Sequence, residues 1–334
     1  MYDDYLAMAS NKPAWQQPEK YDADLFKKDY DCIFVHAEFL YWSVIEAALD
    51  YALKMEHPAP ANAPSGLTWA SGEVKNAEYN MDPGFRISVG FYNAPKYWEV
   101  RGQYTRITNR GFESATKPIP ADEFLDGTFP QVFTNDMTGA HSTIHLNYNV
   151  FDLLADRVFD TNPHLRLRFM GGPTAAWMDQ DWRVRYNDGS GNSTTIRNRW
   201  HYIGGGLRAG IQSDWFWGNN MFVTGLVTTA ALVGQYKNEA KQTATTVTGG
   251  PVRDEKFEDV RPTFTAQVLI GPSWQKNYPR NRVEVFLGYE MTAWLNLQEI
   301  RRSTSAVNNQ AKETWITSGM LALYGITLRA TLDF

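Results

Sequence analysis

The C-terminal stretch Thr314–Phe334 constrains the fold more than any other part of the chain. From Met320 onward every second residue is apolar, namely Met320, Ala322, Tyr324, Ile326, Leu328, Ala330, Leu332 and Phe334. Polar side chains, among them Thr327, Arg329 and Asp333, fall between them. A repeat of two residues is the period of a β-strand and not of a helix. Ordinary strands run to about five or six residues, so this stretch predicts an unusually long strand with one continuous apolar face.

The same alternation recurs along the chain. It covers 31–42, 82–92, 97–107, 139–151, 165–177, 198–212, 219–234, 260–274 and 281–296. In 139–151 the alternation places Ala140, Ser142, Ile144, Leu146, Tyr148 and Val150 on one face and His141, His145, Asn147 and Asn149 on the other. Residues 46–55 are compatible with either a helix or a continuation of the preceding strand. The sequence EAALDYALKM consists of good helix formers, which favours the helix, but it closely follows an alternating stretch. The repeats predict about ten strands.

The connections between these strands alternate in length. Long polar connections lie near 55–70, 109–138, 180–196, 236–256 and 298–313, and short ones near 93–96, 155–163, 213–219 and 275–280. Transmembrane barrels separate long outer loops from short periplasmic turns in this way. No window approaches ~18 uninterrupted apolar residues, the length of a spanning helix. We therefore predict an all-β fold, a transmembrane antiparallel up-and-down β-barrel of about ten strands, with twelve or more left open.

The predicted barrel divides the chain into two parts. Residues 1–30 are polar, contain Pro13 and Pro18, and are expected to form an N-terminal periplasmic tail. Residues 31–334 are expected to form the barrel, with long extracellular loops. The chain contains 18 Phe, 17 Tyr and 12 Trp, which suits the aromatic girdles that barrels place at both membrane surfaces.

Several stretches resemble one known family in their order and spacing. They are FLYWSVIEAALDYA (39–52), MDPGFRISVGFYNAPKYWEVRGQYT (81–105), AHSTIHLNYNVFDLLADRVF (140–159), LRLRFMGGPTAAWMDQDW (165–182), GGGLRAGIQSDWFWG (204–218) and LYGITLRATLDF (323–334). Together they resemble the MOMP-like outer-membrane proteins of chlamydia-related bacteria, which are similar to the Legionella major outer membrane protein. The resemblance implies an abundant outer-membrane barrel with porin activity, and it implies that the terminal Phe334 is an assembly signal read by the barrel assembly machinery. The cysteine cross-linking of Legionella-type proteins does not carry over, since Cys32 is the only cysteine.

The polar face of the strands supplies the candidate functional residues. By strand parity we expect the lumen to be lined by Glu38, Arg86, Glu99, Arg101, Gln103, His145, Arg166, Arg168, Arg208, Gln267, Glu284, Glu290 and Arg329. This set predicts a narrow channel for passive diffusion of small hydrophilic solutes and ions, and its excess of arginine predicts attraction of anions. Two alternatives remain. One is a plugged structural or adhesive barrel whose outer loops bind a host ligand, and the other is an outer-membrane hydrolase.

Other functions are less compatible with the sequence. The net charge is -5 with no massed basic segment, which argues against nucleic acid as a partner. His141 and His145 lie about 13 Å apart on a strand, too far to share a metal ion, and the GGGLRA stretch lacks the helix that a dinucleotide site requires. We expect no cofactor and no catalytic residue, although His57, Asp122, Asp126, Asp136, Asp179 and Asp181 lie in or near outer loops. The expected partners are outer-membrane lipid, the assembly machinery and small solutes, and a homo-oligomer is left open.

Overall fold

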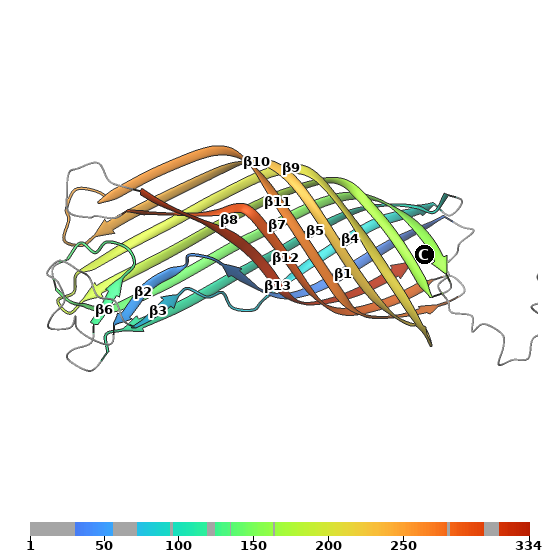
Figure 1. The fold of residues 1–334 in the computed structure, drawn as a ribbon, viewed down its shortest axis with the longest axis horizontal. Helices are drawn as coiled ribbons and strands as arrows, with labels where there is room; N and C mark the ends of the chain where they lie inside the picture. Colours follow the sequence, from blue (N-terminus) through green and yellow to red (C-terminus); the bar gives the residue numbers. More distant parts are fainter. Residues whose placement is uncertain are drawn as a thin grey trace, which may run out of the picture.

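Ten antiparallel strands close into a single barrel (Figure 1). The computed structural model describes residues 31–55, 72–93, 96–118, 124–133, 135–162, 164–278, 281–303 and 314–334. The barrel strands are β1 (Cys32–Glu46), β4 (Asp82–Asn93), β5 (Trp98–Thr116), β7 (Met137–Asn162), β8 (Leu165–Asp188), β9 (Ser193–Gly218), β10 (Met221–Ala244), β11 (Arg253–Asn277), β12 (Arg282–Ser303) and β13 (Thr314–Asp333). β1 pairs with both β4 and β13, which closes the ring. The predicted all-β up-and-down barrel is confirmed.

A small three-stranded sheet lies at the end of the barrel opposite the C-terminus (Figure 1). It consists of β2 (Asp50–Met55), β3 (Gly72–Asn76) and β6 (Phe124–Gly127). Residues 46–55 therefore form the end of β1, a turn and β2, and the helical alternative for them is wrong. Leu49, Tyr51 and Ala52 are buried there in the main apolar core, so tertiary packing overrides the helix propensity of this stretch.

The turns at the C-terminal end of the barrel are short, as predicted, but the bounds 155–163 and 213–219 are wrong, because β7 runs to Asn162 and β9 to Gly218. β9 and β10 are joined by Asn219 and Asn220, whose φ angles are 52° and 63°. Positive φ at both central residues gives the mirror-image turn that suits the twist of a hairpin. At the other end the predicted long loops 180–196 and 236–256 are wrong in extent, because strands run through most of them and leave only 189–192 and 245–252 as connections. Among the other predicted segments, 1–30, most of 55–70 and 304–313 lie outside the described residues.

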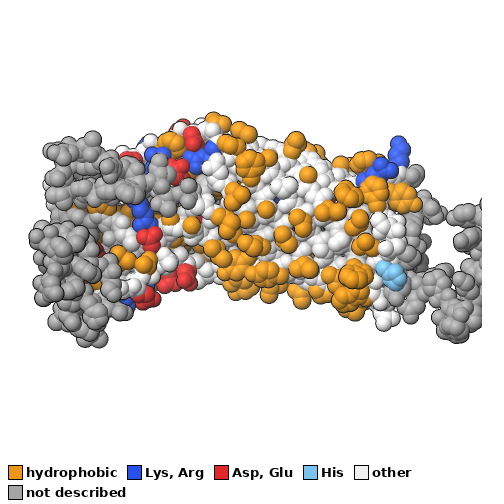
Figure 2. Space-filling view, viewed as in Figure 1, with side chains coloured by type: hydrophobic (Ala, Val, Ile, Leu, Met, Phe, Trp, Pro, Cys, Tyr) orange, Lys and Arg blue, Asp and Glu red, His pale blue; other side chains and the backbone are white. Residues whose placement is uncertain are grey.

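The outer surface of the barrel carries an apolar band. Exposed apolar residues follow one another on each strand, as with Phe85, Ile87, Val89 and Phe91 on β4. In Figure 2 hydrophobic side chains cover the middle of the barrel and the side toward the C-terminal end, and most acidic and basic side chains in view gather nearer the other end. The band is what a lipid bilayer requires of a barrel wall. Among the described residues, no helix is long and apolar enough to cross a membrane.

The interior of the barrel changes character along its axis. Inside the apolar band the inward side chains are mostly charged or polar and buried, as with Arg86, Arg168 and Glu290. Toward the end that carries β2, β3 and β6, the interior is a continuous apolar core that includes Trp42, Trp182, Trp200 and Trp294. The lumen thus has a polar half and an apolar half.

Candidate functional site

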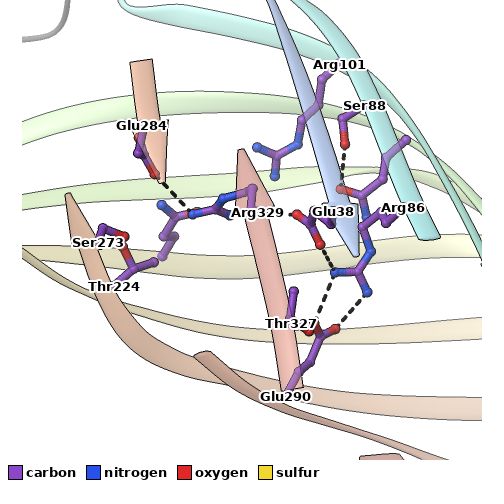
Figure 3. Close-up of polar contacts among 12 residues, drawn as sticks. Glu38, Arg86, Ser88, Arg101, Thr224, Ser273, Glu284, Glu290, Thr327 and Arg329 are labelled. Carbon is purple, nitrogen blue, oxygen red and sulfur yellow. Dashed lines mark hydrogen bonds and ion pairs between the residues drawn. The ribbon is translucent and has the colours of Figure 1, made fainter. Parts of the chain in front are cut away.

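Arg86 on β4 is the centre of the polar half of the lumen. Glu38 lies directly opposite it on β1, and Arg329 lies opposite Glu38 on β13. The Arg86 guanidinium donates to Glu38 at 2.7 Å and reaches Glu290 on β12, at 2.7 Å and 3.1 Å (Figure 3). Thr327 Oγ1 donates a further hydrogen bond of 2.9 Å to Glu290. These contacts connect β4, β1, β13 and β12 across the inside of the barrel.

A second group of ion pairs joins β5, β7 and β8. Arg168 contacts Glu99 at 3.1 Å, and Arg101 contacts Asp156 at 3.0 Å. Arg101 also lies 3.4 Å from Glu99, so one carboxylate is shared between two arginines. Every one of these four side chains is at most 8% exposed. The Arg168–Glu99 and Arg101–Asp156 pairs bridge different strands, whereas Arg101 and Glu99 both lie on β5.

Arg208 on β9 extends the first group to β7 and β11. Its guanidinium lies 2.9 Å from Asp152 on β7 and donates to Gln267 on β11 at 2.8 Å. Gln267 in turn donates to Glu290. The polar side chains therefore form connected groups around the lumen, and not a set of isolated charges.

Further pairs lie toward the C-terminal end of the barrel. Arg282 contacts Asp333 at 2.6 Å, and Arg329 contacts Glu284 at 3.3 Å. Arg166 is the most enclosed cation, 1% exposed, with Asp214 at 3.6 Å as its carboxylate. Burying such charges is tolerable only when each is paired and hydrogen-bonded. Each of these charges has a partner of opposite charge, but Arg166 Nε and Nη1 have no hydrogen-bond partner among the described residues.

Charge in the polar half is nearly balanced. The buried arginines of the network are Arg86, Arg101, Arg166, Arg168, Arg208, Arg282 and Arg329, and the buried carboxylates are Glu38, Glu99, Asp152, Asp156, Asp214, Glu284, Glu290 and Asp333. The arginine excess expected from the sequence is therefore wrong for the described residues. Asp152, Asp156, Asp214 and Arg282 were missed because they lie at strand ends or in stretches predicted to be turns.

The structure places most of the predicted lumen residues inside the barrel, but not His145. Its neighbours Ile144 and Leu146 are buried in the apolar core, so His145 lies on the outer face of β7. There it is opposite Asp181 on β8 and Arg110 on β5. The predicted parity of 139–151 is inverted, because at this level the apolar side chains fill the lumen.

The apolar half of the lumen is packed from wall to wall. Tyr148 on β7 meets Trp294 on β12 edge to face, with ring centroids 6.0 Å apart. β7 and β12 lie on opposite sides of the ring, so this contact spans the lumen. Above it, Tyr186 donates a 2.7 Å hydrogen bond to the Tyr51 carbonyl of the small sheet. Phe129, which follows that sheet, belongs to the same core, so the small sheet caps the barrel.

Charged residues of the polar half line two small cavities among the described residues. Each has a volume of about 30 Å³, and Arg101 and Arg329 line both. Glu99 and Glu284 line one of them, and Arg86 lines the other. One water molecule needs at least about 10–15 Å³, so each cavity has room for a few waters and not for a continuous column of solvent.

Glu46 is a carboxyl group within the apolar half. It follows Ile45, the last exposed apolar residue of β1, and so lies beyond the lipid-facing band. Tyr79 donates to it at 3.0 Å, and Gln180 donates to it as well. Burial raises the pKa of Glu46 to about 8 despite these hydrogen bonds, since desolvation disfavours the charged carboxylate. Sequence parity did not identify this group because it lies where β1 turns into β2.

The acidic and histidine residues considered for catalysis do not converge. Asp136 contacts Lys117, Asp126 accepts from Gln131, and Asp179 contacts His201 on the outer surface. His57 and Asp122 lie outside the described residues. Within the part of the chain that the structure describes, no cluster of His, Cys, Asp and Glu could hold a metal ion.

Solved structures with a similar fold are outer-membrane proteins of low sequence identity. The outer membrane protease OmpT from Escherichia coli is 12% identical, with a TM-score of 0.44 over 94% of this chain and 99% of that one. The Pseudomonas putida toluene transporter TodX is 8% identical, with a TM-score of 0.30 over 91% and 89%. AlkL is 14% identical, with a TM-score of 0.28 over 78% and 98%. No curated protein matches the chain significantly.

The sequence profile of the Legionella pneumophila major outer membrane protein precursor matches residues 27–334. That match covers the whole barrel, and the apolar outer band agrees with it. The protein is therefore a multi-pass β-barrel of the bacterial outer membrane, and it belongs to the family of the Legionella pneumophila major outer membrane protein.

Proposed function

We propose that this protein is a structural outer-membrane barrel whose lumen is closed, and that its interactions are made by the half that projects from the membrane. The observation that carries the proposal is the apolar packing across the lumen, where Tyr148 meets Trp294. Trp42 and Trp200, each 1% exposed, pack in the same core. A passive diffusion pore needs a continuous aqueous path, and this packing supports the plugged alternative.

A narrow porin-like channel is the second candidate. The polar half favours it, because charges of both signs surround cavities with room for water. Its pore-lining residues would be the predicted lumen set without His145. Conduction would then require the apolar half to open, and the nearly balanced charge predicts weak ion selectivity and not a preference for anions.

Conductance in a planar bilayer tests these proposals. With refolded wild-type protein, the conductance is expected to stay at the background level of the bare bilayer. A Tyr148→Ala, Trp294→Ala double variant removes the contact that spans the lumen and is expected to pass ions at least intermittently. Tyr289→Ala is a matched control, since Tyr289 is an aromatic residue of β12 that is 52% exposed on the outer wall. Steady conductance of the wild type that rises with salt concentration would overturn the closed barrel and favour the porin.

Assembly and partners are part of the proposal. Phe334 lies at the seam of the barrel, where its amide and carbonyl form backbone hydrogen bonds of 3.0 Å and 3.2 Å with Ile33. Its ring is 48% exposed on the outer wall, so the assembly machinery could reach it before the seam closes. Homo-oligomerisation, adhesion of the outer half to a host ligand and a place among the chlamydia-related relatives stay predictions.

A further inference from the structure

The outer faces of β7, β8 and β9 carry an excess of cations beyond the lipid-facing band. Arg183 on β8 lies directly opposite Arg197 on β9, which lies opposite Lys241 on β10. Like charges directly opposite one another destabilise a sheet. The whole chain has a net charge of -5, so this row of three cations runs against the overall charge and requires an explanation.

Carboxylates neutralise only part of this row. Arg197 donates to Asp181, at 2.8 Å from its Nε, and Arg199 lies 3.5 Å from the same carboxylate. The hydrogen bonds from Arg197 hold the pKa of Asp181 below its usual range, so this acid is already committed to its neighbours. Within the described residues, the side chains of Arg183 and Arg185 form no ion pair with a carboxylate. Two exposed guanidinium groups on one strand are thus left available for an external anion.

These two arginines line a hollow on the outer wall. It has a volume of about 480 Å³, and its other lining residues are His141, Thr143, Asn187, Gly191 and Asn192. Phe112 borders it on β5: this ring is 64% exposed and stacks on His141, with centroids 6.5 Å apart. Guanidinium groups bind phosphate oxygens in a bidentate manner, and an exposed ring offers a flat apolar surface for the C–H face of a sugar. The lining thus suits a phosphorylated saccharide.

The distance of the hollow from the hydrocarbon core of the membrane distinguishes two sources of a bound phosphate, a phospholipid headgroup and the sugar chain of a glycolipid. On β8 the last outward aromatic residue before the charged rows is Trp177, which stacks on Tyr104 at 5.8 Å. Arg183 is six residues further along, which is about 20 Å on a strand and about 15 Å along the membrane normal at a tilt of ~40°. Phospholipid headgroups extend only about 5–8 Å beyond the hydrocarbon core. The phosphate of a phospholipid headgroup therefore does not reach Arg183, whereas a phosphate on the sugar chain of a glycolipid extends far enough from the membrane.

We propose that this hollow binds phosphate groups on the saccharide chain of an outer-leaflet glycolipid, that is, a lipopolysaccharide. Arg183 and Arg185 hold the phosphate, and Phe112 with His141 contacts an adjacent sugar. Such a ligand neutralises the row of cations while the acyl chains of the same molecule cover the apolar band below. The site is independent of whether the lumen conducts.

Binding of purified lipopolysaccharide with phosphorylated inner sugars to the refolded protein tests the proposal. Wild-type protein is expected to bind it, and Arg183→Gln, Arg185→Gln together should weaken binding by about tenfold or more, equivalent to at least ~1.4 kcal/mol. Lys237→Gln, Lys256→Gln is the matched control, because those exposed cations already pair with Glu258 and Glu239, and it should change binding little. A heat-dependent shift in gel mobility confirms that each variant is folded.

Comparing different ligands shows which source of phosphate the hollow binds. Chemically dephosphorylated lipopolysaccharide should bind to the wild type as weakly as the intact glycolipid binds to the arginine double variant. Phosphatidylglycerol vesicles and inorganic phosphate should bind equally to the wild type and the double variant. Equal lipopolysaccharide binding by wild type and double variant would overturn the proposal. So would a loss of phosphatidylglycerol binding in the double variant that matches its loss of lipopolysaccharide binding, because the site would then recognise any anionic headgroup.

Discussion

Replacing Arg86 by Met should reveal whether the polar half of the lumen is dry. Arg86 is 6% exposed and Glu290 is 1% exposed. The substitution leaves the carboxylates of Glu38 and Glu290 without the guanidinium that holds them at 2.7 Å, and Thr105 loses a 2.9 Å hydrogen bond. Removing one partner of a buried pair costs about 3–5 kcal/mol. We expect the free energy of unfolding to fall by that amount.

A compensated variant separates the charge effect from the loss of packing. In Arg86→Met, Glu38→Met, Glu290→Met all three ionic groups are replaced by apolar side chains. Substituting a whole buried ionic cluster in this way is often neutral or stabilising by about 1–4 kcal/mol. The triple variant should therefore recover most of the stability that the single variant loses.

Urea unfolding of the refolded barrel in detergent, followed by tryptophan fluorescence, measures both changes. Lys237→Met serves as the control, since this exposed lysine pairs with Glu258 on the outer surface at 3.3 Å, where such pairs contribute about 0–1 kcal/mol. A loss below about 1 kcal/mol for Arg86→Met would refute the reasoning. It would mean that water screens the network, as a porin lumen requires.

Three further predictions concern assembly, pH and orientation. Deleting Phe334 should lower the yield of the protein in the outer membrane of cells. Phe334→Ala keeps the backbone hydrogen bonds to Ile33, so it tests the loss of the ring alone. Equal yields for wild type and both variants would contradict an assembly signal. Burial raises the pKa of Glu46 to about 8, so its contribution to stability is present below its unfolded pKa near 4.5 and is lost as pH rises through 8. The melting temperature of Glu46→Gln should therefore rise relative to that of the wild type between pH 5 and 9, about the span of the shift. A constant difference between the two melting temperatures would contradict the buried carboxyl. Protease added to intact cells should cut within 245–252 before 278–281, and the reverse order would invert the orientation.

The sequence predicted the barrel because lipid imposes a simple pattern on its wall. Within the band, apolar residues must alternate with inward polar ones, and the stretches around Phe85, Phe169 and Leu328 display that alternation directly. The same parity located Arg86 and Glu290 correctly on the inner face. The predicted identity of the family follows from the same stretches, since they set the order and spacing of the strands.

The pairing of the lumen charges could not be predicted in the same way. Parity assigns a side chain to a face, but the partner of Arg86 depends on register and on which strands lie across the ring. Glu290 is 204 positions away in the chain. Nor could parity distinguish a hydrated lumen from a lumen whose charges form ion pairs with one another, because both place charges on the inner face. The closed apolar half was missed for a different reason, which concerns the strands that leave the membrane.

A strand that leaves the membrane must invert its pattern. Inside the bilayer the outer face meets lipid, so the barrel holds its polar groups within. Beyond the bilayer both faces would meet water, and the lumen is the only place where apolar surface can be buried. The apolar face of each strand therefore switches from the outside to the inside at the membrane boundary. At the switch two consecutive residues are apolar, one pointing into the lumen and the other pointing outward. The pairs are Val150–Phe151 on β7, Trp177–Met178 on β8, Tyr202–Ile203 on β9 and Leu232–Val233 on β10.

The four inversions lie at similar positions on neighbouring strands. Trp177 is directly opposite Ile203, and Met178 is opposite Tyr202. Reading one phase through such a pair assigns every residue on its far side from the membrane to the wrong face, which is how His145 was placed in the lumen. Consecutive apolar residues also occur within the lipid-facing band, as Leu153 and Leu154 do on β7, so only the four pairs named above mark its edge. In this barrel they also mark where the lumen changes from paired charges to packed aromatic rings, so the membrane boundary on the outside and the plug on the inside have one physical cause.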